Sequence, residues 1–381
     1  MARLCVEGMT RTYQYCDQHG IPYKKVGKLV VATNDLEERR LLALWERAKQ
    51  NQVAGLELVD EAGIREREPA CVGVRAIWSP QTGIVDWGQV ARHYGKVFTS
   101  RGGEILTSFS AVQFSAEGEA GVRVTSADGR SVSCGHVLAC AGLHSDRVAA
   151  LTGCSPEPKI VPFRGEYLLL NPEKAKLIRG NIYPVPDPRF PFLGVHFTIR
   201  MSGGVWLGPN AVLALAREGY SWGQVSPRDL MEVLAYPGFY RLGWRYLGYG
   251  LDQMLGSLVI SRAVKELQKF VPSITREDIR PGPAGVRAQA MNTAGDLVGD
   301  FIFHSGEGEL GSRVIHWPLP PSPSPVWWWT RWRSSGSCDN ASWDGSQSWG
   351  CYFVIFCQSD LYVLLCRVIF EIFIFPEMSS I

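Results

Sequence analysis

An apolar run that ends in Ala-Gly limits the fold of this chain more than any other feature. Residues 137–142 have the sequence Val-Leu-Ala-Cys-Ala-Gly, with no charged or hydroxyl side chain. Such a run is typical of a strand that is buried on both faces, as in a parallel sheet covered by helices. Because glycine has no Cβ, a glycine at the strand end lets another molecule approach the backbone closely. We therefore expect Ala141 and Gly142 at an exposed strand tip that faces an open groove.

The sequence predicts short strands and helices before and after this run. Residues 28–32 predict an apolar strand, and residues 36–51 predict a helix that Asn34 or Asp35 caps, with apolar residues at helical spacing. The other expected elements are strands at 104–107, 111–114, 121–125, 131–134, 286–290 and 297–303, and helices at 86–101 and within 227–270.

Composition excludes several classes of function. With 381 residues, 46% hydrophobic and 20% charged, the chain has the balance of a globular protein with a substantial core. A formal net charge of +2 gives no reason to expect a nucleic-acid partner. The ten cysteines form no C-x-x-C pair and no zinc-spaced cluster with histidine, so we expect free thiols and no metal site. We also find no G-x-G-x-x-G that links a strand to a helix.

The two ends of the chain differ from the middle. Residues 1–9 resemble the interior of a helix with no cap before it, so the chain is expected to begin inside a domain. From Trp317 onward the sequence is Pro-rich and Trp-rich and has no consistent period, which predicts an unstructured tail over 317–381. Residues 351–375 have membrane-helix length, but charged residues interrupt them. An exposed tail is therefore favoured, and membrane association is left open.

A series of motifs resembles the FAD-dependent oxidoreductases of the D-amino-acid-oxidase class. It begins with Thr-Gly-Ile-Val-Asp at 82–86 and continues through Gly-Gly at 102–103 and a strand with Val112. It ends with Ala141-Gly142-Leu-His-Ser. At this place the family commonly has the motif Ala-Gly-x-Trp-Ser, in which x is any residue. The resemblance implies FAD as the cofactor, with Val112, Ala141 and Gly142 among the residues that contact it.

Five longer stretches are similar to the L-2-hydroxyglutarate dehydrogenase family in particular. That family oxidises L-2-hydroxyglutarate to 2-oxoglutarate, and its FAD passes the electrons to an acceptor that this sequence does not identify. The family resides in mitochondria, although no targeting segment is visible here. The stretches lie at 160–170, 180–186, 190–198, 206–211 and 282–289, within a resemblance that covers about 1–316.

The resemblance implies an α/β (α+β) fold with an incomplete FAD-binding Rossmann-like domain and a mixed-sheet substrate domain. The family's Gly-rich turn is missing from the expected place, and its flavin-closing C-terminal segment is out of register after His316. An alternative is therefore a catalytically silent chain that lacks bound FAD and shows no turnover. The FAD-binding segments are expected at 1–22, 86–155 and 285–316, the substrate segments at 23–85 and 156–284, and the divergent tail at 317–381.

The expected substrate is a small 2-hydroxy dicarboxylate, which needs cationic partners and a base. The resemblance places Arg287 in bidentate contact with the 1-carboxylate, and Gly285 in the same motif at the cofactor. His196, on an otherwise apolar strand, is either a satisfied core residue or the base that takes the hydroxyl proton as hydride leaves for the flavin. Arg164 is a candidate for the second carboxylate or for closing a domain interface. Tyr183 is a candidate for lining the substrate pocket.

A second alternative keeps the fold and replaces the hydroxy acid by an amino acid. The sequence around His196 and the Pro-Phe-Arg-Gly motif at 162–165 argue against it. Assays with 2-hydroxyglutarate and with a panel of amino acids distinguish the two substrates.

Overall fold

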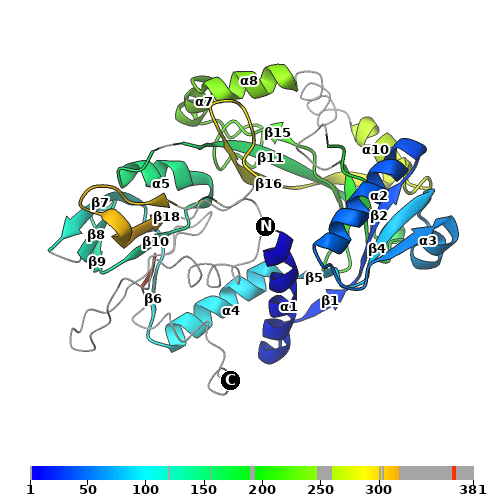
Figure 1. Cartoon of the computed structure of the whole chain (residues 1–381), viewed down its shortest axis with the longest axis horizontal. Helices are drawn as coiled ribbons and strands as arrows, with labels where there is room; N and C mark the ends of the chain where they lie inside the picture. The colour runs from blue at the N-terminus through cyan, green and yellow to red at the C-terminus, as the bar shows by residue number, and fades with distance from the viewer. Residues whose placement is uncertain are drawn as a thin grey trace. The chain divides into compact units, whose positions relative to one another are not determined.

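The chain divides into two compact units (Figure 1). The computed structural model describes residues 2–118, 121–155, 157–188, 194–246, 260–299, 302, 304–316 and 363–365. Unit 1 comprises Met1–Asp86 and Pro162–Arg287, and unit 2 comprises Trp87–Val161 and Ala288–Ile381. Each unit is therefore assembled from segments that are far apart in the sequence.

Unit 1 is built on a nine-stranded mixed sheet, with the order β15-β11-β14-β13-β12-β2-β4-β3 and with β16 paired to β11. β12 and β2 run parallel, whereas β13 and β14 join β12 in antiparallel order and β4 and β3 join β2 in antiparallel order. The strands are β2 (Lys28–Ala32), β3 (Glu57–Asp60), β4 (Arg75–Ser79), β11 (Lys159–Leu170), β12 (Asn181–Pro184), β13 (His196–Ile199), β14 (Val205–Gly208), β15 (Val212–Leu213) and β16 (Ile279–Met291).

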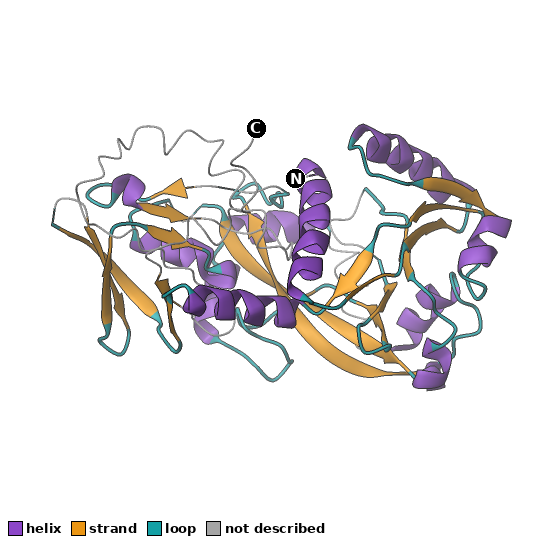
Figure 2. Cartoon of the chain, turned by 90° about the horizontal axis from the view of Figure 1, so that it is seen from below, coloured by secondary structure: helices purple, strands orange, loops and turns teal. Residues whose placement is uncertain are grey.

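One face of this sheet forms the main hydrophobic core of unit 1. Successive side chains of a strand point to opposite faces, so alternate apolar residues gather on one side. They pack against α3 (Glu61–Arg67) and α10 (Ile260–Gln268), and Figure 2 shows helices flanking the strands. The core residues contributed by the central strands and these helices include Leu29, Val31, Ile64, Ile182, Phe197, Leu207, Val264 and Leu267.

The opposite face is covered over only part of its width by α2 (Asp35–Gln50). Leu41 of this helix packs with Ala32 and Ile77 in a second core cluster over β2 and β4. The side chain of Asn34 caps the helix by accepting from the N–H of Glu37 at 3.1 Å. The sequence prediction of a capped helix after the first apolar strand is thus confirmed. The side chains that β12 and β13 direct to this face form the candidate site described below.

Helix α1 (Ala2–His19) belongs to unit 1. The hydroxyl of Tyr13 donates to the carbonyl of Gln81 at 2.6 Å, and its ring centroid lies 4.7 Å from that of Tyr23. These contacts join α1 to the strand pair β1 (Tyr23–Lys25) and β5 (Gly83–Val85). The compact unit thus differs from the expected grouping, which placed 1–22 with the cofactor-binding segments. In the part of unit 1 that the structure describes, the remaining helices are α6 (Pro172–Ala175), α7 (Pro227–Leu234) and α8 (Pro237–Arg245), with the 3₁₀ turn η2 (Arg276–Asp278).

Unit 2 combines small sheets with helices around one core cluster. β7, β8 and β9 are joined antiparallel, β10 pairs in parallel with β18, β18 pairs antiparallel with β17, and β6 pairs with β19. The elements are α4 (Trp87–Ser100), β6 (Glu104–Leu106), β7 (Ala111–Glu117), β8 (Gly121–Ser126), β9 (Ser131–Cys134), β10 (Val137–Ala139), η1 (Gly142–His144), α5 (Ser145–Leu151), β17 (His304–Ser305), η3 (Gly311–Arg313), β18 (Val314–His316) and β19 (Val363–Leu365).

Residues 137–139 of the apolar run form β10, and the end of the run at Ala141 and Gly142 is buried. Val137 lies opposite Val314 in the parallel pair with β18. Ala141 keeps 8% of its surface exposed and packs within the core cluster of unit 2, and Gly142 is buried as well. The expectation of an exposed tip is therefore wrong, because these small residues are covered by neighbouring side chains.

Part of the expected tail forms a strand. β19 pairs antiparallel with β6, and Val363 lies opposite Leu106. These three residues are the part of the expected tail that the structure describes, and the rest of 317–381 lies outside the described residues. Among the helices of the described ranges, none combines the length and the apolar character that crossing a membrane requires.

Glu68 joins two segments of unit 1 from a buried position. It directly follows α3, and 1% of its surface is exposed. Its carboxylate accepts from the backbone N–H of Arg179, at 3.0 and 3.1 Å, and from that of Gly180. Burial raises the pKa of this carboxyl to about 7, and the two backbone donors oppose that shift.

Replacing Glu68 by alanine should destabilise the protein, because the buried N–H of Gly180 and the partly buried N–H of Arg179 lose their acceptor. Each such group costs about 1–3 kcal/mol. Chemical denaturation of Glu68→Ala should show that reduction in the free energy of unfolding. The control is Glu66→Ala, whose side chain is 79% exposed and whose loss should change stability by no more than about 0.5 kcal/mol. Equal losses for the two variants would contradict this account of Glu68.

Candidate functional site

A group of polar side chains lies on the sheet face of unit 1 that α2 leaves uncovered. We call it the polar face, and it consists of Lys28, Tyr183, His196 and Thr198. Ile182 lies opposite Phe197, so one step along the antiparallel pair Tyr183 lies opposite His196. Thr198 follows His196 by two positions and therefore points to the same side. Lys28 lies beside Asn181 in the parallel pair, two positions before Tyr183, which again gives the same side.

His196 is buried at the start of β13 and is fixed by two contacts. Its surface is 8% exposed, and its ring stacks on that of Tyr183 with centroids 4.1 Å apart and planes 23° apart. Nδ1 lies 3.0 Å from the carbonyl oxygen of Gly194. Because a carbonyl only accepts, Nδ1 carries the hydrogen and Nε2 keeps the lone pair in the neutral ring. Nε2 is therefore the nitrogen that is able to accept a proton.

The surroundings of His196 favour its neutral form. Burial lowers the pKa of His196 to about 4, the hydrogen bond to Gly194 raises it, and the positive charge of Lys28 lowers it further. The imidazole is thus uncharged at neutral pH. A general base must be unprotonated before it acts, so this state suits proton abstraction.

The ring of Tyr183 contacts both His196 and a lysine. The phenol oxygen lies 3.4 Å from the hydroxyl of Thr198, and Lys28 Nζ lies 5.5 Å from the centroid of the Tyr183 ring. Burial raises the pKa of Tyr183 and lowers the pKa of Lys28. The sequence analysis predicted Tyr183 as a site residue and missed Lys28, since a lysine at the first position of an apolar strand resembles an ordinary strand boundary.

Arg164 is fully buried and has partners within unit 1. Nη2 and Nε lie 3.0 and 3.2 Å from a carboxylate oxygen of Glu166, and the guanidinium lies 4.3 Å from the ring centroid of Trp222. Nη1 also donates to the carbonyl of Gly219 at 3.5 Å. These contacts are those of an arginine that holds a strand to the loop beside it. A role of Arg164 in binding the second carboxylate stays a prediction.

Arg287 ends the second segment of unit 1, on β16. Its side chain is exposed, although nearby protein atoms desolvate the guanidinium enough to lower its pKa. Gly285, on the same strand, has open space where a Cβ would stand. The expected contact of Arg287 with the substrate 1-carboxylate stays a prediction.

The other expected cofactor residues lie in unit 2. Val112 is 46% exposed and sits at an irregularity in the register of β7 and β8. After β10 the chain turns through Ala141 and Gly142, whose φ is +50°, into η1 and α5. The end of a parallel strand that leads into a helix is where α/β folds bind dinucleotides, so this junction fits part of an FAD site.

The described residues of unit 2 do not include a glycine-rich turn that could bind the pyrophosphate of FAD. The chain has one G-x-G-x-x-G match, Gly306-Glu-Gly-Glu-Leu-Gly311. It connects β17 to β18, and Gly306 N–H donates to the carbonyl of Val314 at 2.7 Å. The match is therefore a strand–strand connection, whereas a dinucleotide turn leads from a strand into a helix.

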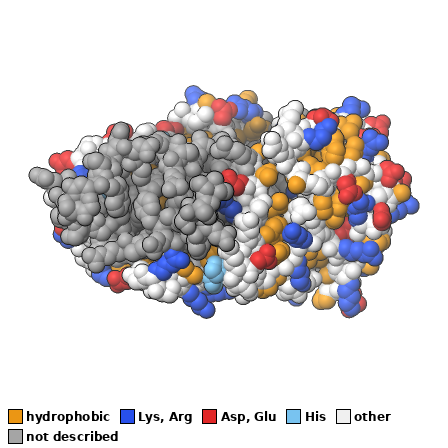
Figure 3. Space-filling model, turned by 60° about the horizontal axis from the view of Figure 1, so that its bottom comes forward, with side chains coloured by type: hydrophobic (Ala, Val, Ile, Leu, Met, Phe, Trp, Pro, Cys, Tyr) orange, Lys and Arg blue, Asp and Glu red, His pale blue; other side chains and the backbone are white. Residues whose placement is uncertain are grey.

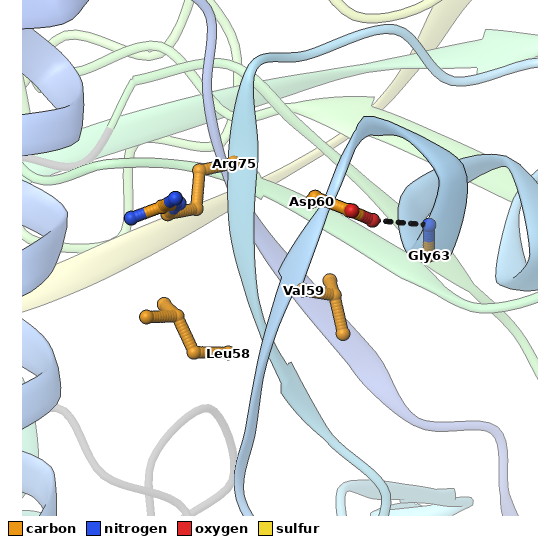
Figure 4. A pocket seen from close by; sticks show the side chains of 5 residues that line it. All are labelled: Leu58, Val59, Asp60, Gly63 and Arg75. Atoms are coloured by element: carbon orange, nitrogen blue, oxygen red, sulfur yellow. Dashed lines mark hydrogen bonds between the residues drawn. The ribbon is translucent and has the colours of Figure 1, made fainter.

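Two surface features of the structure do not belong to the predicted site. A hollow of about 360 Å³ lies beside β3 and β4 (Figure 4). Asp60 there accepts from the N–H of Gly63 at 2.9 Å and caps α3, and Arg75 pairs with Glu38 at 3.2 Å. On the face in Figure 3, basic and acidic side chains alternate over the described residues instead of forming one basic patch. The residues that line the hollow are Leu58, Val59, Asp60, Gly63 and Arg75.

Comparison with known structures identifies the fold. The chain resembles L-alpha-glycerophosphate oxidase from Mycoplasma pneumoniae, solved with FAD bound, with a TM-score of 0.61 at 16% identity over 83% of this chain and 73% of that one. It also resembles L-amino acid deaminase from Proteus vulgaris, with a TM-score of 0.56 at 14% identity over 85% of this chain and 78% of that one. At these identities the likeness establishes the fold alone.

Comparison of sequences identifies the family. A family model described as FAD dependent oxidoreductase matches residues 1–336, which extends past the predicted limit at His316. The mitochondrial L-2-hydroxyglutarate dehydrogenase of Nematostella vectensis is 52% identical over 85% of this chain and 74% of that protein. The proteins of the same name from Caenorhabditis elegans and Homo sapiens are 51% and 48% identical over 85% of this chain and 75% and 72% of theirs. The chain therefore belongs to the L-2-hydroxyglutarate dehydrogenase family of FAD-dependent oxidoreductases.

Proposed function

We propose that the polar face of unit 1 binds L-2-hydroxyglutarate and that the FAD-loaded chain oxidises it to 2-oxoglutarate. The names of the relatives supply the substrate. The observation that carries the proposal is the buried, neutral His196, whose Nε2 keeps its lone pair beside a tyrosine and a lysine. This arrangement combines a proton acceptor with a positive charge, and a hydroxy dicarboxylate needs both.

The reaction removes a proton and a hydride from the substrate. His196 Nε2 accepts the proton of the C2 hydroxyl, so that a carbonyl forms at C2 as the C–H bond breaks. FAD held beside Ala141 and Gly142 would supply the hydride acceptor, and an unidentified partner would then take the electrons. Arg287 binds the 1-carboxylate through two parallel N–H groups and so orients C2. Stacking on Tyr183 holds the imidazole in one orientation.

The location of the protein follows from its relatives. The proteins from Nematostella vectensis, Caenorhabditis elegans and Homo sapiens are all named as mitochondrial. We propose the same compartment for this chain.

A catalytically silent chain is the competing hypothesis. It is favoured by one observation, the strand–strand connection formed by the G-x-G-x-x-G match at 306–311. An amino-acid oxidase is a further alternative, because the deaminase from Proteus vulgaris has the same fold. Turnover of an amino acid in preference to L-2-hydroxyglutarate would favour that alternative.

The purified chain, supplied with FAD, should retain the cofactor after gel filtration and show the visible absorbance of bound flavin. Addition of L-2-hydroxyglutarate under anaerobic conditions should bleach that absorbance, because the reaction reduces the flavin. The D-enantiomer is the control and should leave the spectrum unchanged. A protein that emerges free of flavin would support the silent chain instead.

His196→Ala should lower kcat of the FAD-loaded chain by roughly 100- to 10,000-fold, the usual contribution of a general base. His19→Ala, at the exposed last residue of α1, is the control and should leave the rate unchanged. Because only the neutral imidazole accepts a proton and the pKa of His196 is about 4, kcat/KM should stay level from pH 7 to about 5 and fall as the pH approaches 4. An acid limb centred near pH 6.5 would contradict the assignment.

Arg287→Lys keeps the positive charge and loses the bidentate geometry. It should weaken binding of 2-oxoglutarate, measured by calorimetry, by about 1.5–3 kcal/mol, as for hydrogen bonds to charged groups. Arg280→Lys changes an exposed arginine on the same strand and serves as the matched control. Equal affinities of the two variants would remove Arg287 from the substrate site.

A further inference from the structure

We propose that Lys28 binds the distal carboxylate of the substrate and thereby selects dicarboxylates over monocarboxylates. This inference rests on the proposed function, because it requires the substrate to occupy the polar face. It concerns a residue that the sequence analysis did not single out.

The position of Lys28 is the first argument. It begins β2, and the parallel pairing of β2 with β12 puts it on the face that carries Tyr183 and His196. Its Nζ lies 5.5 Å from the Tyr183 ring centroid, and the other contact of that ring is His196, whose centroid is 4.1 Å away. The ammonium and the proposed base therefore both lie against the same aromatic ring. Attraction of a cation to an aromatic ring helps hold Nζ there.

The charge of Lys28 is the second argument. The buried arginines of unit 1 have carboxylate partners: Arg164 pairs with Glu166 at 3.0 Å, and Arg217 pairs with Glu232 at 3.2 Å. Among the described residues, the group that acts electrostatically on Lys28 is the thiol of Cys5, and no carboxylate lies within ion-pair distance. Removing a cation from water without a partner is costly. A ligand carboxylate in this place would offset that cost.

The length of the substrate is the third argument. Three carbon–carbon bonds separate C2 from the carbon of the distal carboxylate in L-2-hydroxyglutarate. If C2 lies at His196 and the 1-carboxylate at Arg287, the distal carboxylate therefore lies about the width of one side chain away from His196. Lys28, which contacts the same aromatic ring as His196, is the cation of the polar face that such a ligand would meet.

The test measures ligand binding and stability of Lys28→Met in the full chain supplied with FAD. The probes are 2-oxoglutarate and 2-oxopentanoate, which have the same chain length and differ by the distal carboxylate. Calorimetry should show that Lys28→Met binds 2-oxoglutarate about 10- to 100-fold more weakly, the range for a hydrogen bond to a charged group, and binds 2-oxopentanoate as the wild type does. Lys28→Arg should recover part of the lost affinity, because it keeps the charge.

Thermal unfolding separates a binding role from a structural one. Methionine has a similar volume and needs no charged partner, so Lys28→Met should unfold at the same temperature as the wild type or at a higher one. Lys24→Met, at an exposed position of β1, is the matched control and should change neither affinity nor stability. A lower unfolding temperature together with equal loss of affinity for both ligands would assign Lys28 a structural role and overturn the inference.

The outcomes also separate this inference from the function on which it rests. A wild-type protein that prefers 2-oxoglutarate, with a Lys28→Met variant that keeps the preference, would overturn the role of Lys28 and leave the proposed function standing. A wild-type protein that binds neither ligand, or both equally, would overturn the two together.

Discussion

The alternation of side chains across the central strands of unit 1 is the constraint on which the candidate site depends. Leu29, Ile182 and Phe197 lie in the core on one face, so their neighbours Lys28, Tyr183 and His196 are directed to the other. A shift of one residue in the register would bury the polar side chains and expose the apolar ones. The hydrophobic core thus fixes the site, although none of its residues takes part in the chemistry.

The buried polar groups of unit 1 are of two kinds. Arg164 and Glu68 have partners supplied by the chain itself, a carboxylate in the first case and backbone N–H groups in the second. Those pairings explain how unit 1 tolerates charge in its interior. His196 and the half-buried Lys28 differ, because burial lowers the pKa of both, and among the described residues their neighbours are the Gly194 carbonyl, the Tyr183 ring and the Cys5 thiol. Perturbed groups of this kind are typical of functional sites.

Much of the fold was predictable because it follows from local pattern. The apolar strand that became β2 and the capped helix that became α2 depend on the spacing of residues within one segment. β16 is longer than the predicted strand at 286–290 and includes Pro281 and Pro283. Prolines are tolerated at the edge of a sheet, and β16 pairs with β11 outside the main strand order. Local sequence does not reveal which strand takes that edge.

The site was less predictable, because it depends on which strands become neighbours. His196 and Tyr183 were identified through motifs of the family, and their stacking could not be inferred from either motif alone. Lys28 lies more than 150 residues before them, and only the β2–β12 pairing brings it to the same face. The burial of Ala141 was mispredicted for a similar reason, since contacts from distant segments of unit 2 cover it.

The central claim is that the polar face of unit 1 is where the substrate binds. A crystal structure of the FAD-loaded chain with 2-oxoglutarate tests it most directly, because it locates the ligand without reference to rates. The account predicts the C2 oxygen within hydrogen-bond distance of His196 Nε2 and the ligand lying along the Tyr183 ring. Electron density for 2-oxoglutarate away from these side chains, with the polar face occupied only by water, would contradict it.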